Sequence, residues 1–470
     1  MLEEIPFWNH LSKWGNSIAL IDGLSGEVIN YRTLDATVSL VAETFAPRQG
    51  GVLLLSFSRT IPAIVCYLAC LRAGCVVLPV SETASPSEVR LTCENFQPEY
   101  LALCSSQEVG LDVRYSLIRD LGGLRIFESH NTNLKAHAAV RAVMPTSGSM
   151  SKQKYVRLSE RNLAVSAAQV SAAMALSPQE RAITVLPLNH VFGLSVLHGQ
   201  IAVGGSLLVS PLSVLDHRFW DSVRNWNVTA LSGVPWTFEI MQKLGISTEY
   251  APTLNKFSLS GGRTSVELRD WLVKNYVRRD AAVLFMYGQT EAAGRITVLK
   301  PELAGSDKFS VGTVVPGGSL KFAEDGEILY SGANVMMGYA RQRDELAQSD
   351  LMRGELPTGD LGKLSEDGRL YLYGRKDREV KIYGVRINLD ELEAFYRNVG
   401  AVAVMADHHV ISVYGEMLKL SHLKGRTTEL ADHLRLPISS IRVYSVRTIP
   451  RTDAGKILYP LLGQCELWDQ

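Results

Sequence analysis

Strand-like and helical segments alternate over most of the sequence, and this alternation restricts the fold more than any other feature. Helical spacing over residues 33–45 and 61–73 is interleaved with buried-strand patterns over 51–56 and 75–80. Further strand patterns occur at 183–186, 206–210, 229–234, 256–260 and 281–287, with helices expected around Phe219, Phe238 and Leu268. Strands that alternate with helices predict an α/β fold with largely parallel sheets.

The composition favours a small-molecule substrate. The 470 residues are 46% hydrophobic and 20% charged, and this length predicts two to four domains with a large buried core. Lys plus Arg and Asp plus Glu are both 48, so no excess charge indicates a nucleic acid or an acidic membrane as partner.

The N-terminal residues, the length of the apolar stretches and the cysteines predict a cytoplasmic protein. Residues 1–6 show neither the basic segment nor the apolar core of a signal peptide. The apolar stretch 61–71 is too short to span a bilayer. The six cysteines form no C-x-x-C pair, which favours reduced structural thiols over metal or disulfide chemistry.

A loop of small and hydroxylated residues follows an apolar run at 138–143 and precedes a helix that we expect to open at Ser159, with Asn162 and Leu163 in its first turn. It reads Pro145-Thr146-Ser147-Gly148-Ser149-Met150-Ser151-Lys152-Gln153-Lys154. Small residues let backbone N–H groups close on an anion, while the hydroxyls and lysines add donors and charge, so the loop suits a triphosphate. It lacks the G-x-x-x-x-G-K-[ST] pattern of a P-loop. On composition alone, the alternative is a solvated turn.

Four further motifs follow in order. They are Tyr287-Gly288-Gln289-Thr290-Glu291, Thr358-Gly359-Asp360, Gly374-Arg375-Lys376-Asp377 and Arg451-Thr452-Asp453-Ala454-Gly455-Lys456. Together with the loop, this ordered set resembles the adenylate-forming superfamily, which includes acyl-CoA synthetases, aryl-CoA ligases, luciferases and the adenylation domains of peptide synthetases. The resemblance covers almost the whole chain. It implies activation of a carboxylic acid by ATP and Mg²⁺ to an acyl-adenylate, release of pyrophosphate, and transfer to a thiol.

The phosphate loop departs from the family pattern, which is roughly T-S-G-T-T-G-x-P-K-G. The chain matches it at Thr146, Ser147, Gly148 and Lys154 and differs at Ser149, Met150, Ser151, Gln153 and Tyr155. Loss of two glycines and a proline predicts a stiffer, bulkier loop with an altered grip on pyrophosphate. A decayed loop is the alternative interpretation.

The resemblance assigns the nucleotide site. In the motif 287–291, which includes Gln289, Tyr287 would offer a flat face to adenine and Gly288 would let the backbone approach closely. Thr290 would donate to the α-phosphate, and Glu291 would be a ligand for Mg²⁺. The alternative is a strand end followed by a helix-capping Thr-Glu pair. Asp360 would accept both ribose hydroxyls and Arg375 would donate to the same ribose, whereas the plainer interpretation of Asp360 is a turn aspartate.

The resemblance also divides the chain at the fourth motif. Residues 1–374 would bind AMP and the acid, and 375–470 would form a mobile catalytic α+β domain. Asp377 would be the hinge of a rotation between two catalytic poses. Lys456 would lie between the substrate carboxylate and the α-phosphate. Gly384 would line the tunnel of the thiol.

The expected acid is a fatty, aryl or cyclic carboxylate without an amino group. The segment 189–193 resembles the H-x-x-G phrase of acyl and aryl synthetases, with His190 as the histidine. No acidic residue occurs between Arg181 and Leu215, so an α-ammonium group would lack a counter-charge. His190 could instead be a packed histidine. Gly261, Gly262 and Arg263 follow a predicted strand, and Arg263 would either narrow the acid pocket or meet a polar group.

The acceptor is less constrained than the nucleotide. CoA is expected, with carrier-protein phosphopantetheine or an amine as alternatives. No Gly-Gly-x-Ser carrier motif is present, so a carrier would act in trans. The altered phosphate loop suggests a non-catalytic nucleotide- or acyl-adenylate-binding homologue, but the presence of Glu291, Asp360 and Lys456 together argues against it. The sequence indicates neither the acid nor the oligomeric state.

Overall fold

The computed structural model of the 470-residue chain describes residues 5–105, 107, 115–131, 135–146, 154–277, 281–307, 309–383, 385–396, 398–407, 410–434, 436–451 and 457–468. The chain divides into two compact units. The first comprises Met1–Ser319 and Tyr330–Leu356, and the second comprises Leu320–Leu329 and Pro357–Gln470. The sequence analysis places the boundary between the binding domain and the mobile domain at 374/375, next to the expected hinge, and this boundary stays a prediction.

In the described part of the first unit, nine strands form one sheet in the order β16-β15-β14-β13-β12-β10-β11-β1-β2. These strands are β1 (Ile18–Asp22), β2 (Val28–Asn30), β10 (Arg181–Ile183), β11 (Ser206–Val209), β12 (Ala230–Gly233), β13 (Lys256–Leu259), β14 (Ala282–Tyr287), β15 (Thr297–Leu299) and β16 (Thr313–Val314). The pairs from β14 to β1 are parallel, and the strands at both edges are antiparallel.

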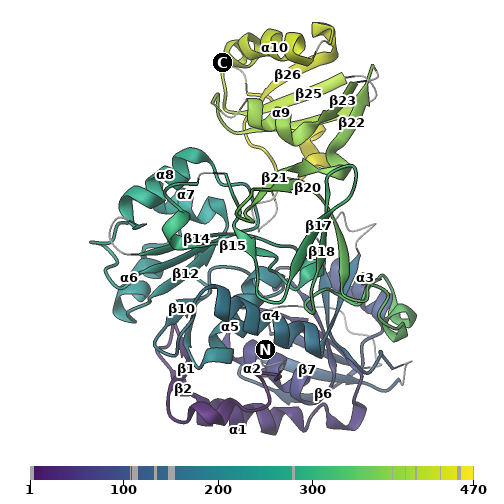
Figure 1. The fold of residues 1–470 in the computed structure, drawn as a ribbon. Helices are drawn as coiled ribbons and strands as arrows, with labels where there is room; N and C mark the ends of the chain where they lie inside the picture. Colours follow the sequence, from purple (N-terminus) through teal and green to yellow (C-terminus); the bar gives the residue numbers. More distant parts are fainter. Residues whose placement is uncertain are drawn as a thin grey trace. The chain divides into compact units, whose positions relative to one another are not determined.

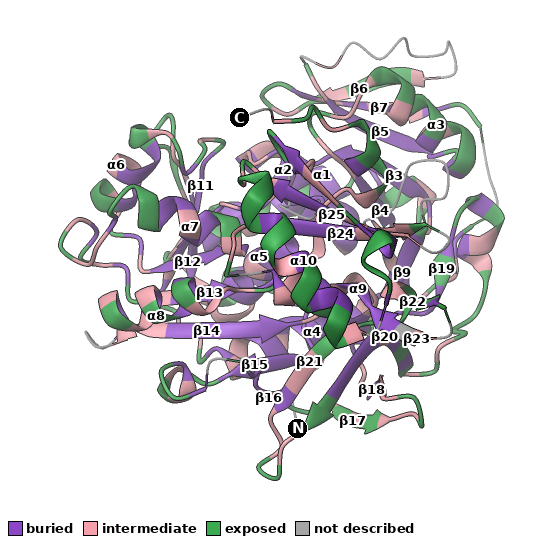
Figure 2. Ribbon diagram, turned by 90° about the horizontal axis from the view of Figure 1, so that it is seen from above, coloured by how far each residue is buried: buried purple, intermediate pink, exposed green. Residues whose placement is uncertain are grey.

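Helices connect the parallel strands of this sheet. They are α5 (Val191–Val203), α6 (His217–Asn225), α7 (Pro235–Lys243) and α8 (Val266–Asn275). Figure 1 shows α6, α7 and α8 beside β12 and β14. Phe219, Phe238 and Phe257 pack with Tyr276 in the apolar core of this region. β14 is buried over most of its length, as Figure 2 shows.

A second sheet of the first unit has the order β19-β9-β8-β4-β3-β5-β7-β6 among the described strands. Its strands are β3 (Val52–Ser56), β4 (Val76–Val80), β5 (Tyr100–Cys104), β6 (Tyr115–Asp120), β7 (Leu124–Ser129), β8 (Val140–Pro145), β9 (Tyr155–Ser159) and β19 (Tyr339–Ala340). Four helices accompany it in sequence: α1 (Tyr31–Ala42), α2 (Ile61–Arg72), α3 (Pro86–Phe96) and α4 (Glu160–Ala173). α2 is buried along nearly its whole length because it is apolar on all sides.

The predicted α/β fold is confirmed, with two refinements. Each predicted strand and helix has a counterpart, but the strand expected over 183–186 ends at Ile183. Both sheets are parallel at the centre and antiparallel at the edges, so they are mixed. The helix predicted after the phosphate loop is α4, which begins at Glu160, and its N-cap residue Ser159 forms a capping box with Asn162. The strand β9 before it was not predicted.

The second unit contains the C-terminal elements. β17 (Ser319–Phe322), β18 (Glu327–Ser331), β20 (Glu355–Leu364) and β21 (Leu370–Arg375) form a sheet that belongs mainly to this unit. β22 (Glu379–Ile382) and β23 (Val385–Asn388) form a hairpin. β24 (Val402–Asp407), β25 (Val410–Glu416) and β26 (Ile441–Val446) form a three-stranded sheet, which packs with α9 (Leu389–Phe395) and α10 (Leu420–Leu434). The outer face of α10 is exposed (Figure 2).

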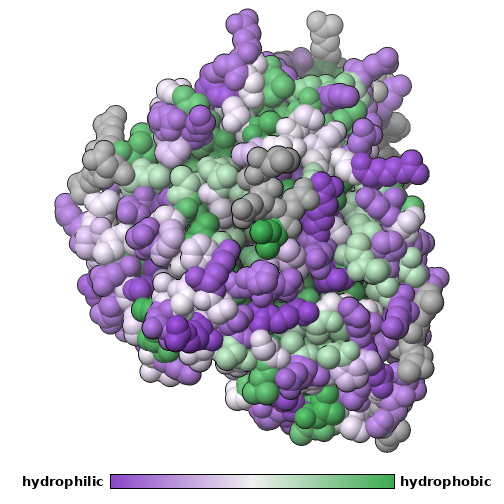
Figure 3. All heavy atoms as spheres, turned by 60° about the horizontal axis from the view of Figure 1, so that its bottom comes forward, coloured by the Kyte–Doolittle hydropathy of each residue, from purple (hydrophilic) through white to green (hydrophobic). Residues whose placement is uncertain are grey.

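Within the described ranges, the chain has no helix suited to span a membrane and no disulfide bond. None of the helices there combines the length and apolar character that a bilayer span requires. Hydrophilic and hydrophobic residues are interspersed on the face drawn in Figure 3. All six cysteines are free, and Cys66, Cys70 and Cys75 are buried.

Candidate functional site

Several predicted site residues meet at the carboxyl edge of the nine-stranded sheet. β10, β12, β13 and β14 are parallel neighbours, so the loops that follow them leave the sheet at the same edge. Gly261 and Gly262 follow β13, with exposed Arg263 next, while Gly288 follows β14. A Cβ at Gly261 would lie 3.1 Å from Cγ1 of Val234, the residue after β12. The structure thus places the predicted acid loop beside neighbouring strand ends.

Buried hydrogen bonds hold the loop that follows β14. Asn334 Nδ2 donates to the carbonyl oxygens of Ala292 (2.8 Å) and Arg295 (2.9 Å), and its Oδ1 accepts from the Tyr330 hydroxyl (2.7 Å). Ser166 Oγ donates to the carbonyl of Ala293 at 2.8 Å. These supports were not predicted, because single Asn and Ser residues far along the chain carry no sequence signal. They fix the shape of the Tyr287–Arg295 segment.

Thr290 and Glu291 do not cap an α-helix. They form a single 3₁₀ turn, Thr290–Ala292, whose N-cap residue Gln289 makes no side-chain cap hydrogen bond. Gly288 is required at its position because a Cβ there would overlap the carbonyl oxygen of Gly294. The capping alternative for the Thr-Glu pair therefore has no helix to cap.

Tyr339 links Glu291 to the base of the predicted phosphate loop. Its hydroxyl donates to Glu291 Oε1 at 2.9 Å, and Lys154 Nζ lies 5.0 Å from the centre of its ring. The backbone N–H and Oγ1 of Thr146 donate to the carbonyl of Lys154 at 3.0 and 2.8 Å, which closes the loop at its base. Ser147, Gly148 and Ser149 lie outside the described residues. Tyr339 is a site residue that the sequence analysis missed.

The residues around Glu291 fit a magnesium ion that is shared with a nucleotide. The described residues contain no group of three His, Cys, Asp or Glu side chains that would hold a metal by themselves. Mg²⁺ commonly takes one or two carboxylates and completes its shell with substrate phosphates and water. The half-buried Glu291 carboxylate, with Lys154 nearby on the same tyrosine, suits that arrangement.

His190 and Gly193 lie at the start of α5. His190 is the N-cap residue of this helix and is half-buried, and its side chain does not cap the helix. A Cβ at Gly193 would overlap the carbonyl oxygen of Pro187, so a glycine is needed there for close packing. At Gly262, by contrast, the nearest atoms to a Cβ would be those of Pro235 at 3.4 Å. A side chain at position 262 would therefore be accommodated more easily than one at position 193.

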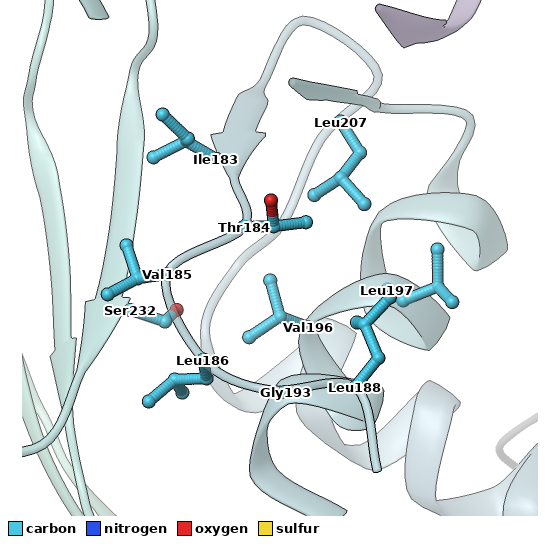
Figure 4. A pocket seen from close by; sticks show the side chains of 10 residues that line it. All are labelled: Ile183, Thr184, Val185, Leu186, Leu188, Gly193, Val196, Leu197, Leu207 and Ser232. Carbon is cyan, nitrogen blue, oxygen red and sulfur yellow. The ribbon is translucent and has the colours of Figure 1, made fainter. Parts of the chain in front are cut away.

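A small cavity lies next to Gly193. Its volume is about 10 Å³, and it is lined by Ile183, Thr184, Val185, Leu186, Leu188, Gly193, Val196, Leu197, Leu207 and Ser232. Figure 4 shows that Val196 and Leu197 come from α5 and that Thr184 to Leu186 come from the segment after β10. The space holds about one water molecule, so an acid bound here must displace side chains.

In the second unit, the β20–β21 register brings Asp360 opposite Arg375. Arg375 Nη1 lies 3.0 Å from Oδ1 of Asp360, which is 8% exposed. The Thr358 hydroxyl donates to the carbonyl of Ile328 (2.9 Å) and accepts from the Asp360 N–H (3.1 Å). The two residues predicted to share the ribose are thus neighbours.

The predicted hinge, Asp377, lies between two anchored residues. Lys376 Nζ pairs with Asp325 (2.6 Å) and Glu327 (2.9 Å), on the hairpin of β17 and β18. Arg378 pairs with Asp390 (2.8 Å) and Glu393 (2.7 Å), on α9. The Asp377 side chain is 70% exposed and contacts Arg375 Nε at 3.0 Å. Lys456 and Gly384 lie outside the described residues, so their predicted roles stay predictions.

A family model described as "AMP-binding enzyme" matches residues 7–340 of this chain. The chain belongs to the AMP-binding enzymes. The predicted membership of the adenylate-forming superfamily is thereby confirmed. The predicted ligase type agrees with the curated relatives.

Among curated relatives of this AMP-binding enzyme, the 2-succinylbenzoate–CoA ligase of Staphylococcus aureus (strain MRSA252) is 22% identical over 495 residues, covering 96% of this chain and 98% of the relative. The nonribosomal peptide synthetase sirP of Leptosphaeria maculans is 27% identical over 95% of this chain, but over only 21% of its own length.

Solved structures share the fold. O-succinylbenzoate coenzyme A synthetase (MenE) from Bacillus subtilis in complex with AMP has a TM-score of 0.78 at 23% identity, with coverage of 99% of this chain and 100% of the other. ATP-bound MatB from Rhodopseudomonas palustris has a TM-score of 0.78 at 21% identity, with coverage of 97% and 98%. At this identity the likeness shows the fold.

Proposed function

We propose that this AMP-binding enzyme activates a non-amino carboxylic acid with ATP and transfers the acyl group to CoA. In the first step, a carboxylate oxygen attacks the α-phosphorus of ATP, and the bond to the β-phosphate oxygen breaks with loss of pyrophosphate. In the second step, a thiolate attacks the acyl carbon and AMP leaves. The observation that carries the proposal is the contact of both Lys154 and Glu291 with Tyr339. It brings a cation of the phosphate loop and a magnesium-type ligand to one place.

The first unit supplies the groups for adenine and phosphate. Tyr287, at the end of β14, would offer an aromatic face to adenine, and Gly288 would let the backbone approach the nucleotide closely. Thr290 supplies a hydroxyl and Glu291 a carboxylate for Mg²⁺, and bound Mg²⁺ would neutralise charge on the phosphates. Thr146, Ser147, Gly148, Ser149 and Lys154 would donate to the β- and γ-phosphates.

The second unit supplies the groups that would bind the ribose, and it contains the segment that we expect to move. A carboxylate has lone pairs for two hydroxyl donors as well as for Arg375, so Asp360 can bind the ribose while it remains paired. Lys456 would stabilise charge in the first step and Gly384 would line the thiol tunnel, with Asp377 as the pivot between the two poses. Its two anchored neighbours, Lys376 and Arg378, support a pivot at this residue.

The absence of acidic residues between Arg181 and Leu215 and the largely apolar lining beside Gly193 support a non-amino acid substrate. The 2-succinylbenzoate–CoA ligase relatives support CoA as the acceptor. A carrier protein in trans is the second candidate acceptor, which the peptide synthetase relative supports. Because ATP and CoA are cytoplasmic, we also propose a cytoplasmic location.

The deciding experiment is acid-dependent ATP–pyrophosphate exchange by the purified full chain with fatty, aryl and cyclic acids. We expect exchange with at least one class and a shift of its Mg²⁺ dependence to higher concentration in Glu291→Gln. Glu302→Gln, at an exposed position, is the matched control and should leave that dependence unchanged. Exchange with no acid would refute catalysis and favour a binding protein. CoA, carrier protein and amines, offered in turn, then identify the acceptor.

A further inference from the structure

Four arginines are buried among the described residues of the first unit, and three of them have clear structural partners. Arg343 pairs with Glu99 at 2.7 Å. Arg157 donates to the carbonyls of Gln348, Met337 and Ser349. Arg269 stacks on Phe285 at 4.0 Å and donates from both terminal nitrogens to the carbonyls of Asp307 and Ser310. In each case, carboxylate or carbonyl oxygens satisfy the terminal nitrogens of the guanidinium.

The fourth buried arginine, Arg295, lacks a comparable set of oxygen acceptors. It is 2% exposed, and Nη1 donates to the carbonyl of Gly294 at 2.7 Å. Its Nε has no partner, as in Arg157 and Arg269, but here only Nη1 makes a hydrogen bond, and no carboxylate within the described ranges pairs with this side chain. Burial lowers the pKa of Arg295 to about 9. A buried cation without an anion is costly, so a guanidinium with unused donors points to a ligand.

The surroundings of Arg295 favour an anion as that ligand. Its guanidinium lies 4.2 Å from the centre of the Phe192 ring, in the first turn of α5. A Cβ at the adjacent Gly294 would lie 3.4 Å from Cγ2 of Val191, the first residue of that helix. The N-terminus of a helix carries partial positive charge, which adds to the cost of the buried cation and would add to the binding of an anion.

Phe192 also connects Arg295 to the acid loop. A Cβ at Gly261, in the loop after β13, would lie 4.0 Å from Cδ1 of Phe192. The next residue, Gly193, lines the small cavity. One aromatic ring therefore lies against the guanidinium and near the Gly261 corner, so a single side chain separates Arg295 from the expected acid loop.

We infer that Arg295 recognises a second anionic group, a carboxylate, on the acid that this enzyme activates. This inference rests on the proposed function and narrows its substrate class to acids with two carboxylates. One carboxylate reacts with ATP and the other binds the guanidinium in a bidentate manner, with support from the first turn of α5. Arg295 is a binding residue that takes no part in bond formation.

The test compares each dicarboxylic acid with its own monomethyl ester. Straight-chain diacids of three to eight carbons and the three benzenedicarboxylic acids are assayed by ATP–pyrophosphate exchange in the purified full chain. We expect at least one diacid to exceed its ester by roughly tenfold or more in kcat/KM, mostly through KM, as fits a charged bidentate pair. Arg295→Met should abolish this preference. Arg269→Met, the matched buried arginine on a phenylalanine ring, should lower the melting temperature and keep the preference.

The outcomes separate this inference from the proposed function. Equal activity with diacids and esters in the wild type, or an unchanged preference in Arg295→Met, would overturn the role of Arg295 and leave the ligase proposal intact. Exchange with no acid would refute the ligase. In that case, thermal shift decides: a diacid but not its ester should raise the wild-type melting temperature, and no shift would overturn the anion site. Arg295→Lys, which keeps the charge but loses the fork, replaces Arg295→Met if the latter does not fold, and should lose most of the preference.

Discussion

The two regions that carry the nucleotide motifs are held by different kinds of interaction. The Tyr287–Arg295 loop is fixed by neutral hydrogen bonds from Asn334 and Ser166, which are 0% and 3% exposed. The segment 375–378 is held by charged side chains, and those of Lys376 and Asp377 are 48% and 70% exposed. One region is a buried neutral network, and the other is a set of ion pairs that reach solvent.

This difference suggests different mechanical roles. A buried, satisfied network is costly to disturb and keeps one geometry. Exposed ion pairs contribute little stability and exchange partners at small cost. The loop after β14 is therefore suited to be a rigid platform for the nucleotide. The segment at Asp377 is suited to a change of backbone angles between two poses.

The largest expected effect concerns the C-terminal part of the chain, which we expect to move between two poses. Lys456→Ala should slow acyl-adenylate formation by roughly 10²- to 10³-fold, the scale for loss of one electrostatic donor in a transition state. Thioester formation from supplied acyl-adenylate should stay nearly intact, because the expected domain rotation would have carried Lys456 away. Pyrophosphate release measures the first step, and consumption of synthetic acyl-adenylate with a thiol measures the second.

Asp377→Pro is the counterpart of Lys456→Ala. Proline fixes φ and should block the second pose, so thioester formation falls and acyl-adenylate formation is kept. Equal damage to both steps in both variants would contradict the two-pose mechanism and with it the mobile role of this segment.

The next prediction tests whether the hydrogen bonds of Asn334 hold the loop after β14. Asn334→Ala removes a side chain that bonds two carbonyls and a tyrosine hydroxyl, all in buried surroundings. Loss of these partners should lower the free energy of unfolding of the first unit by about 2–4 kcal/mol. Denaturation by urea measures it, with the exposed Asn225→Ala as control. A loss no greater than that of the control would show that the platform is not held by this network.

The sequence predicted the helices and strands well, because they leave local signals, whereas the roles of the motif residues stay predictions. The capping box at Ser159 and the glycine at 288 are examples of such local signals, since each local geometry demands a residue type. The structure adds that β13 and β14 are parallel neighbours, so the loops after them leave the sheet at the same edge. Asp360 and Arg375 were predicted as partners on the ribose, and the hairpin register places them side by side.

What the sequence could not predict depends on contacts between distant segments. Tyr339 meets Glu291 only because β19 pairs with β9 next to the phosphate loop. Asn334 and Arg295 likewise acquire their importance from burial, which no local pattern reveals. Of the two glycines beside the expected acid pocket, Gly193 and Gly262, only Gly193 is packed against backbone. Gly262→Ala is therefore the cleaner probe of acid size.

A smaller effect is expected in the phosphate loop, whose central residues lie outside the described part. The double variant Ser147→Ala and Ser149→Ala should raise the KM for ATP or lower kcat by roughly tenfold or more, given about 1.5–3 kcal/mol for a hydrogen bond to a charged group. Steady-state kinetics with varied ATP measure both quantities. Wild-type kinetics in the double variant would remove these hydroxyls from the mechanism and favour the decayed-loop interpretation.

The smallest expected effect concerns the anchors on either side of Asp377. Asp325 and Glu327 raise the pKa of Lys376 through hydrogen bonds and charge, but all these contacts are near solvent. Lys376→Met should therefore change thioester formation by about threefold or less, and added salt should produce the same change in the wild type, because exposed pairs are screened.

Arg378→Met is the matched variant for Lys376→Met. The Arg378 side chain is 12% exposed, pairs with Asp390 and Glu393, and lies 3.9 Å from the centre of the Tyr459 ring. Its loss should slow thioester formation more than the loss of Lys376, and salt should not mimic it, since less exposed pairs are screened less. If salt and Lys376→Met leave the second step unchanged while Arg378→Met slows it, the pivot is fixed from the α9 side alone. If all three have no effect, ion pairs do not control this segment, and the contrast with the buried network of Asn334 fails.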